Sequence, residues 1–370
     1  MRPRPFARRR RDDDDGDYRE KRPGRGRKQK SGATALWIGL GVGGAVLALL
    51  VVVVVAVVVG RKPAGPDVAA APPAPPGQPA RPGVVPAPAA LPAVDAPPVD
   101  AKVVTVSELS APRPIQPGVL FQEAVLRPGV LPMKVWYYRH EKADGKLSLV
   151  LVPPAGSTLV AGMDLSDGDR VEHYPYVRAG FAVGSFEIDG HVPDAQSRSD
   201  AAVLKGARAF RDARAGLTNA KAALDYLLAK SPDVDPNRVF IAGHSSAATL
   251  ALLVAEHEPR IKGCVSYCGV SDVESRVAPF IPQLDRAIPG YRDFIRFSSP
   301  KTHAEKLTCP VLLFHAKDDT NVPVSQTTSF GELLKKTNTD VTVDTTARGG
   351  HYQSMISSGI PRGIAWMRKK

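Results

Sequence analysis

The chain has 370 residues, of which 43% are hydrophobic, which suits one large globular domain or two small ones. Its net charge of +12 is uneven, because residues 1–30 hold 13 Lys or Arg against 6 Asp or Glu, and this net of +7 leaves +5 for the remaining 340 residues. The body of the chain therefore lacks the basic excess of a nucleic-acid-binding protein, and no nucleic-acid partner is expected.

The cysteines are too few for a disulfide framework or a structural zinc site. Cys264, Cys268 and Cys309 are an odd number, and no CxxC pair or cluster of His and Cys accompanies them. If Cys264 and Cys268 lie on one strand, their separation of roughly 13 Å is too long for a disulfide. We expect no metal and no organic cofactor.

The N-terminal part of the chain has the pattern of a membrane anchor. Residues 1–32 are a basic segment that we expect to be disordered, and residues 31–60 contain no charged side chain. A membrane-spanning helix needs ~20 apolar residues, so we predict one transmembrane helix over 33–60. A cleavable signal peptide is the alternative, although its apolar region is usually only ~7–15 residues long. Because Lys and Arg gather before the helix, the N-terminus is expected in the cytoplasm and everything after Gly60 outside it.

Residues 61–102 have the composition of a linker. Thirteen prolines fall between positions 63 and 98, with Ala, Gly and Val between them. Such segments favour extended polyproline conformations at ~3.1 Å per residue. We therefore expect a stalk that connects the membrane helix to a globular, extracytoplasmic domain over 103–370. The protein would be a single-pass membrane protein, and its oligomeric state is not predicted.

The globular part begins with strands and continues as alternating helices and strands. The expected strands lie at 119–127, 131–139, 146–152, 181–188, 239–243, 261–269, 311–316 and 341–346. The expected helices lie at 200–230, 247–257 and 325–337. This alternation predicts an α/β fold with a mainly parallel central sheet and helices on both faces. The aromatic-containing stretch 271–297 interrupts it, and is interpreted as a lid over the site or as an ordinary helical insertion packed on the core.

The stretch VFIAGHSSAA, residues 239–248, places a serine between a strand and a helix. In such a tight turn the Oγ of Ser245 projects from the carboxyl edge of the sheet, and the N–H of Ser246 faces developing negative charge. The crowded turn requires small neighbours, a condition that Gly243 meets. Ala247 stands where the G-x-S-x-G signature has its second glycine. By itself, this match is weak.

The residues that a nucleophilic serine needs follow in the required order. A serine hydroxyl must give its proton to a base, and a carboxylate must orient that base. The strand VLLFHA is followed directly by Asp318 and Asp319, and the strand VTVDTT is followed by Gly349, Gly350 and His351. The order of serine, acid and histidine, each just past a strand, is that of an α/β-hydrolase. Chemistry alone does not choose between the two aspartates.

Three longer stretches carry a family resemblance. DPNRVFIAGHSSAATLALLVAEHEPRIKGCVSYCGVSD, SSPKTHAEKLTCPVLLFHAKDDTNVPVSQTTSF and RGGHYQSM resemble the prolyl-oligopeptidase-like α/β-hydrolases, which include the peptidase S9 catalytic domain and dienelactone-hydrolase-like relatives. The resemblance covers about residues 119–370 and implies the α/β-hydrolase fold. It selects Asp319 as the acid, because His315, Asp319, Val322 and Pro323 reproduce the family pattern H-x-x-x-D-x-x-V-P. Asp318 would then cap a loop.

The resemblance also implies an oxyanion hole. The loop LVLVPPAGSTL follows a central strand, and there Pro154, Ala155 and Gly156 replace the residues His-Gly-Gly that are frequent in the family. Backbone N–H groups of Gly156 and Ser246 would then stabilise the oxyanion, since glycine permits close approach to a carbonyl oxygen. With Ser245, Asp319 and His351 as the triad, no cofactor is required.

The predicted function is that of a membrane-anchored serine hydrolase that cleaves peptide or ester bonds in small substrates through an acyl-enzyme. No repeat with the period of a β-propeller precedes the domain, which leaves a carboxylesterase or dienelactone-hydrolase-like acyl hydrolase as an alternative. Ala247 and the Pro-Pro-Ala-Gly loop motivate a third hypothesis, a catalytically silent hydrolase fold that serves as a binding module.

Overall fold

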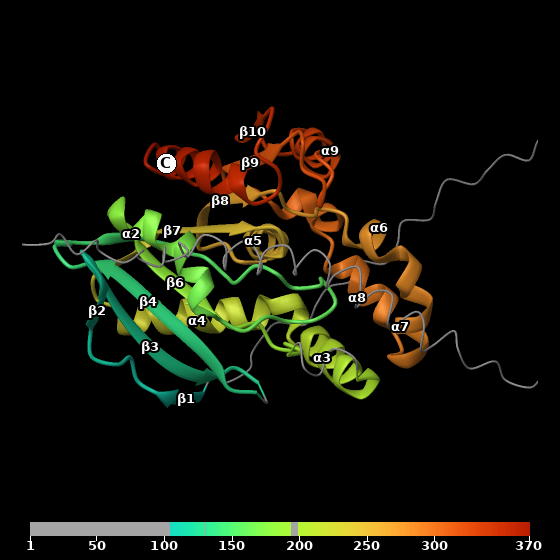
Figure 1. Ribbon diagram of the computed structural model, residues 1–370, viewed down its shortest axis with the longest axis horizontal. Coiled ribbons are helices and arrows are strands. Elements are labelled where there is room, and N and C mark those ends of the chain that lie inside the picture. Colours follow the sequence, from blue (N-terminus) through green and yellow to red (C-terminus); the bar gives the residue numbers. More distant parts are fainter. Residues whose placement is uncertain (1–103, 130, 194–198) are drawn as a thin grey trace, which may run out of the picture. The chain divides into compact units, whose positions relative to one another are not determined.

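The computed structural model describes residues 104–129, 131–193 and 199–370 (Figure 1). The predicted basic segment 1–32, transmembrane helix 33–60 and linker 61–102 lie outside these residues. Within the described ranges, no helix is both long enough and apolar enough to cross a membrane.

The described residues are built around one ten-stranded sheet. Its strands are β1 (Val104–Ser107), β2 (Arg113–Gln116), β3 (Val119–Arg127), β4 (Met133–His140), β5 (Leu147–Leu151), β6 (Ala182–Phe186), β7 (Val234–His244), β8 (Ile261–Tyr267), β9 (Val311–Ala316) and β10 (Val341–Thr346). Their order is β1-β3-β4-β6-β5-β7-β8-β9-β10, and β2 pairs with β3.

The sheet is mixed, which corrects the prediction of a mainly parallel one. β3 pairs antiparallel with β1, β2 and β4, and β4 pairs antiparallel with β6. All the ladders from β6 through β5, β7, β8 and β9 to β10 are parallel. Parallel pairing needs a crossover, and helices connect these strands, whereas short connections fold the first strands back as antiparallel neighbours.

Helices cover both faces of the sheet, as expected. They are α2 (Arg170–Arg178), α3 (Asp200–Asp212), α4 (Leu217–Lys230), α5 (Ser246–His257), α6 (Val273–Val277), α7 (Ile281–Ala287), α8 (Tyr291–Phe297), α9 (Ser325–Leu334) and α10 (Ile360–Met367) (Figure 1). The apolar side chains form two buried clusters, one on each face. α4, α5 and α9 contribute to the first, and α2 and α10 to the second. The α/β-hydrolase-like arrangement therefore agrees with the strand and helix pattern of the sequence.

The stretch 200–230, predicted as one helix, is two helices. α3 ends at Asp212 and α4 begins at Leu217, and the backbone between them turns through positive φ values of 56° at Ala215 and 92° at Gly216. A helix cannot continue through left-handed residues, because their N–H and C=O groups leave the helical direction. The apolar spacing was correct on both sides of this break but did not reveal it.

The stretch 271–297 forms α6, α7 and α8, which lie grouped together in Figure 1. Tyr291, Phe294 and Phe297 are buried in the first apolar cluster. The ring of Phe294 lies 5.8 Å from that of Phe210 on α3, in an edge-to-face arrangement that favours aromatic packing. These three aromatic side chains thus form part of the domain core.

Candidate active site

Ser245 occupies a strained turn between β7 and α5. Its backbone has φ 56° and ψ −120°, a conformation that L-residues rarely adopt, and its N–H donates to the carbonyl oxygen of Tyr267 at 2.9 Å. Gly243 makes this turn possible, because a Cβ there would lie 2.3 Å from the carbonyl oxygen of Ala247. Ala247 itself is accommodated in the core with 1% exposure. The missing second glycine therefore does not prevent the turn.

The loop expected to complete the oxyanion hole is bonded to the residue after the serine. Gly156 and Ser157 donate their backbone N–H groups to the Oγ of Ser246, at 3.1 and 3.0 Å. Gly156 has a φ of 103°, which glycine adopts without strain. The backbone N–H of Ser246 lies in the first turn of α5, where N–H groups lack intrahelical acceptors. The structure thus brings Gly156 and Ser246 together, with the Ser246 hydroxyl between the loop and the helix.

A small cavity adjoins this loop. Its volume is about 20 Å³, room for one water molecule, and its walls include Ser157, Ser246, Phe210 and Val273. Val273 belongs to α6, so the helical insertion reaches the neighbourhood of the strained serine. The position of Val273 in the cavity wall is the feature of the insertion that agrees with its interpretation as a wall of the substrate site.

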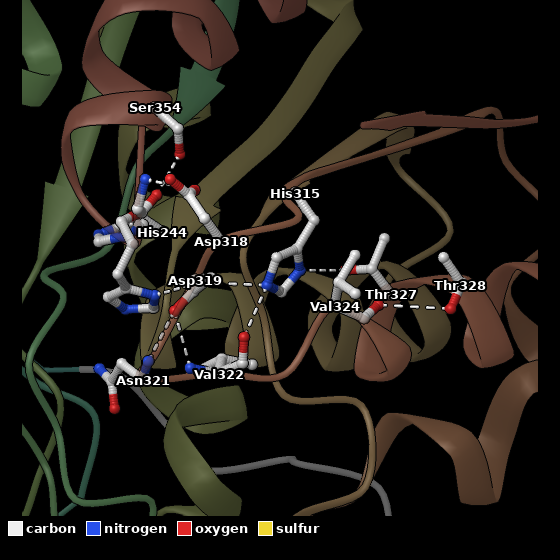
Figure 2. Close-up of polar contacts among 12 residues, drawn as sticks. His244, His315, Asp318, Asp319, Asn321, Val322, Val324, Thr327, Thr328 and Ser354 are labelled. Carbon is white, nitrogen blue, oxygen red and sulfur yellow. Dashed lines mark hydrogen bonds and ion pairs between the residues drawn. The ribbon is translucent and has the colours of Figure 1, made fainter. Parts of the chain in front are cut away.

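Asp319 lies just past β9 in a fully satisfied buried position (Figure 2). Its Oδ1 accepts the backbone N–H groups of Asn321 and Val322 at 2.8 and 2.9 Å. Its Oδ2 accepts a hydrogen bond from the Nδ1 of His351 at 2.7 Å and lies 3.1 Å from the Nε2 of His315. Burial alone raises the pKa of Asp319, but the hydrogen bonds from His315 and His351 outweigh it and hold this pKa well below its usual range.

His315 is the residue behind that carboxylate. It is fully buried, its Nδ1 lies 2.7 Å from the Oγ1 of Thr327, and its Nε2 lies 2.9 Å from the carbonyl oxygen of Val322 (Figure 2). Because Nε2 faces two oxygens, it carries a hydrogen there. The sequence identified His315 only as part of the family pattern, and the contact with Asp319 gives that pattern a physical reason.

The two ring nitrogens of His351 lie in different environments. Nδ1 carries the hydrogen that is donated to Asp319, which leaves Nε2 to accept a proton. Nε2 is buried and has no hydrogen-bond partner among the residues that the structure describes. The ring of His351 lies 4.6 Å from that of His244, the residue directly before Ser245. The predicted base therefore lies next to the strained turn.

Asp318 does what the sequence suggested for it. Its two oxygens accept the backbone N–H groups of Gly350 and Gly349, at 2.8 and 3.1 Å. These bonds, that from Gly350 first, lower the pKa of Asp318. Asp318 is thus a cap for the loop that carries His351, and within the described residues its hydrogen bonds go to the backbone of that loop.

One group in the described part of the chain has the spacing of metal ligands. Cys268, His315 and Asp319 place possible ligand atoms within 4.8 Å of one another. Both nitrogens of His315 are engaged in hydrogen bonds, and burial raises the pKa of Cys268 to about 12, which keeps its thiol protonated. The three residues therefore do not form a suitable set of metal ligands. We interpret Cys268 and His315 as neighbours that support Asp319.

Residues 209–368 match the family model of the prolyl oligopeptidase family. This part of the chain is similar to serine hydrolases of the prolyl oligopeptidase type. The resemblance predicted from the motifs is thereby confirmed, and the match contains Ser245, Asp319 and His351. None of the curated proteins compared with the chain is similar to it in sequence.

Solved structures share the fold. Pyrococcus horikoshii acylaminoacyl peptidase is 17% identical with a TM-score of 0.53, over 71% of this chain and 41% of that one. A Mycobacterium tuberculosis puromycin-hydrolyzing peptidase is 20% identical with a TM-score of 0.51, over 65% and 38%. A Klebsiella pneumoniae protein described as a dienelactone hydrolase is 16% identical with a TM-score of 0.51, over 68% and 99%. The chain thus spans about two fifths of the peptidases and nearly all of the smaller hydrolase.

Sequence reasoning missed one polar group near the site. Glu172, on α2, lies 3.8 Å from the Nδ1 of His244 through its Oε1. The helix was not predicted, because its sequence RVEHYPYVR contains Pro175 and has no clear apolar period. Nothing in the sequence linked residue 172 to residue 244.

Proposed function

We propose that Ser245, His351 and Asp319 are the catalytic triad of this hydrolase. The Nε2 of His351 accepts the proton of the Ser245 hydroxyl as its Oγ attacks an ester or amide carbonyl carbon. The protonated imidazole then gives that proton to the leaving group, and a water molecule hydrolyses the acyl-enzyme by the same steps. Asp319 holds the Nδ1 hydrogen of His351, so that Nε2 remains the basic nitrogen.

The negative charge that develops on the carbonyl oxygen needs donors. The backbone N–H of Ser246 at the start of α5 is the first of them, and the loop at Gly156 supplies the second. Since the N–H of Gly156 donates to the Ser246 hydroxyl, this loop is held close to the first donor before substrate binds. Donors that are fixed in advance lose little free energy through reorganisation when the charge appears.

The strained backbone of Ser245 is the observation that carries this proposal. A serine at φ 56° costs conformational free energy, and such strain gathers at functional sites. Next to it stands a histidine with one nitrogen on a buried carboxylate and the other unpartnered among the described residues. A catalytically silent binding module would gain nothing from the strained backbone of Ser245 or from the Nε2 of His351, unpartnered within the described ranges.

Labelling of the full-length chain with a fluorophosphonate probe tests the triad. Wild type should be labelled on Ser245, as located by mass spectrometry of the peptides, and Ser245→Ala should not be labelled. Ser246→Ala keeps the nucleophile and should still be labelled, although more slowly than wild type, because it removes only the hydroxyl that holds the oxyanion loop. If Ser245→Ala reacts to the same extent as wild type, the assignment is wrong.

We further propose that the substrates are small peptides or esters. A carboxylesterase activity remains the second candidate, because the described domain spans nearly the whole of a smaller hydrolase and under half of the peptidases. Paired panels of p-nitrophenyl esters and aminoacyl chromogenic amides separate the two. Turnover of amides at rates comparable with esters supports a peptidase, and turnover of esters alone supports the esterase.

We also propose that the hydrolase is anchored in the membrane through residues 33–60, with its catalytic domain outside the cytoplasm. The uncharged run of residues 31–60 and the basic excess before it support this proposal. Membrane fractionation with carbonate extraction tests the anchor, and protease digestion of intact cells tests the side. Release of the whole chain by carbonate would contradict the anchor.

A further inference from the structure

His244 joins the nucleophile's turn to the loop of the proposed base. It is the last residue of β7 and is 4% exposed. Its Nε2 lies 3.1 Å from the backbone carbonyl oxygen of His351, and the two rings are 4.6 Å apart. The ring of Tyr352, the next residue of that loop, lies 5.6 Å away. His244 thus contacts both the backbone and the ring of the proposed base.

The contacts of His244 determine where its hydrogen lies. A carbonyl oxygen only accepts hydrogen bonds, so the Nε2 of His244 carries the hydrogen and donates it to His351. Burial, followed by the neighbouring His351, lowers the pKa of His244 to about 3. The ring is therefore neutral near pH 7, and its Nδ1 presents a lone pair.

That lone pair faces Glu172. The Oε1 of Glu172 lies 3.8 Å from the Nδ1 of His244, and the carboxyl side chain is only 12% exposed. Burial, with a further contribution from Asp169, raises the pKa of Glu172 to about 8. Near pH 7 the carboxyl is therefore mostly protonated, and at 3.8 Å from Nδ1 it lies beyond direct hydrogen-bond distance. Its other titratable neighbours are tyrosines: Tyr176 on the same helix, Tyr267 of β8 and Tyr352.

The helix that carries Glu172 is held firmly against the sheet. The guanidinium of Arg170 lies 4.4 Å from the ring of Trp136 and 4.5 Å from the ring of Phe121, both cation–π distances. Tyr176 and Tyr267 share a buried hydrogen bond of 2.8 Å between their hydroxyl groups. Glu172 is thereby presented to His244 from a fixed position.

The loop that carries His351 needs such support. Gly349 and Gly350 precede His351 with φ values of 124° and 60°, and glycine has the most conformational freedom to lose. Asp318 holds the N–H groups of these two glycines, and His244 holds the carbonyl oxygen of His351. The side chains of Asp318 and His244 therefore both tie this loop, together with Ser354, whose Oγ donates to the carbonyl oxygen of Gly350 at 2.6 Å.

We propose that His244 and Glu172 are positioning residues for His351, in which His244 anchors the backbone of the base and Glu172, 3.8 Å from the Nδ1 of His244, favours the tautomer that keeps the hydrogen of His244 on Nε2. This inference rests on the proposed function, because it requires His351 to be the general base. A carboxylate at position 172 would instead attract a hydrogen to Nδ1 and weaken the bond from Nε2.

Three histidine variants of the full-length chain test whether the bond from His244 to the backbone of His351 positions the base. His244→Phe removes the donor and should lower kcat for p-nitrophenyl acetate about ten- to hundredfold with KM changed less than threefold, since a misplaced base slows the chemical step. His244→Gln retains an N–H donor at the same reach and should recover most of kcat. The matched control is His303→Phe in η5 (Pro300–Lys306), which removes a similar buried bond of 3.0 Å to the carbonyl oxygen of Phe297 at the end of α8 and should leave kcat within twofold.

The dependence of kcat on pH tests the proposed role of the Glu172 carboxyl group. As the pH rises through about 8, wild type should lose kcat because Glu172 ionises, and Glu172→Gln should lack this decline because glutamine cannot ionise. Superimposable profiles of wild type and Glu172→Gln would overturn the role of Glu172. If His244→Phe fails to fold, the comparison of His244→Gln with His244→Leu takes its place.

The controls separate this inference from the proposed function. Equal kcat for His244→Phe and wild type, with wild type labelled on Ser245, would overturn the inference and leave the triad intact. Wild type that is neither labelled nor active would overturn the triad itself, and with it the inference.

Discussion

The two sides of the proposed site are built differently. On the acid side, Asp319 receives two backbone N–H groups, a bond from His351 and a contact from His315, and each partner is itself held in place. On the oxyanion side, the N–H groups of Gly156 and Ser157 meet a single hydroxyl, that of Ser246. The acid side is fixed by several independent contacts, whereas the N–H groups of Gly156 and Ser157 share one side-chain acceptor.

This difference follows from chemistry. A buried carboxylate costs several kcal/mol unless its oxygens are satisfied, so the acid must be surrounded by donors whether or not substrate is bound. Oxyanion donors act on a charge that exists only during the reaction, and before it their N–H groups need another acceptor. In this chain the acceptor for the loop is Ser246.

The largest effect is expected on the acid side. Asp319→Asn should lower kcat for p-nitrophenyl acetate by about 10³- to 10⁴-fold, because an amide does not hold the Nδ1 hydrogen of His351 and the basic nitrogen is lost. Asp318→Asn is the neighbouring control, and it should cost less than tenfold, since only the loop cap is weakened. Similar losses in the two variants would contradict the assignment of the acid.

A smaller effect is expected on the oxyanion side. Ser246→Ala leaves the N–H groups of Gly156 and Ser157 without their acceptor, and kcat should fall about tenfold while KM changes little. Ser246→Thr keeps the hydroxyl and should restore most of the rate. A rate for Ser246→Ala equal to that of wild type would show that the loop is held by other contacts.

The lowered pKa of Asp319 should also make the free energy of unfolding depend on pH. The pKa of Asp319 in the folded protein lies below its unfolded value of about 3.9, so its carboxylate stabilises the fold above that value and the stabilisation is lost as the pH falls further. Urea unfolding of wild type and Asp319→Asn should therefore differ most at pH 6 and converge towards pH 3. A difference that grows towards acid pH would contradict the lowered pKa.

The smallest effect is expected at the position of the missing glycine. Ala247→Gly introduces glycine into the first turn of α5 and removes a buried methyl group, so it should lower stability by about 1 kcal/mol. For a domain of this size, that corresponds to a decrease in Tm of roughly 2–4 °C. Thermal unfolding with a parallel kcat measurement checks this, and a marked rise in kcat would mean that Ala247 restricts the turn.

The sequence predicted every strand of the parallel half of the sheet, and in the antiparallel half it predicted β3 and β4 but not β1 and β2. β3, β9 and β10 have the predicted bounds, because each is an uninterrupted apolar or alternating run between turn residues. α2 was missed because Pro175 and the two tyrosines on either side of it obscure its period, and the break at Gly216 was missed because apolar spacing continues across it. The antiparallel half depends on connections that a strand pattern does not specify.

For the candidate site, the sequence by itself determined the residue types, their order and their places just past strands. Ser245, Asp319 and His351 follow from the need for a nucleophile, an orienting acid and a base, and parallel strands bring their carboxyl ends to one edge. Which aspartate serves His351 came from the family pattern, and the geometry agrees with it through the bond of 2.7 Å from Nδ1 of His351 to Asp319.

Only the tertiary structure decided the contacts between distant segments. Gly156 meets Ser246 across 90 residues, and His244 meets His351 across 107 and also faces Glu172 from a helix that the sequence did not reveal. Local patterns record which face of a strand or helix is buried, because burial repeats with the period of the element. They do not record which polar atom of one element faces which atom of another, since that depends on how the helices pack across the finished sheet.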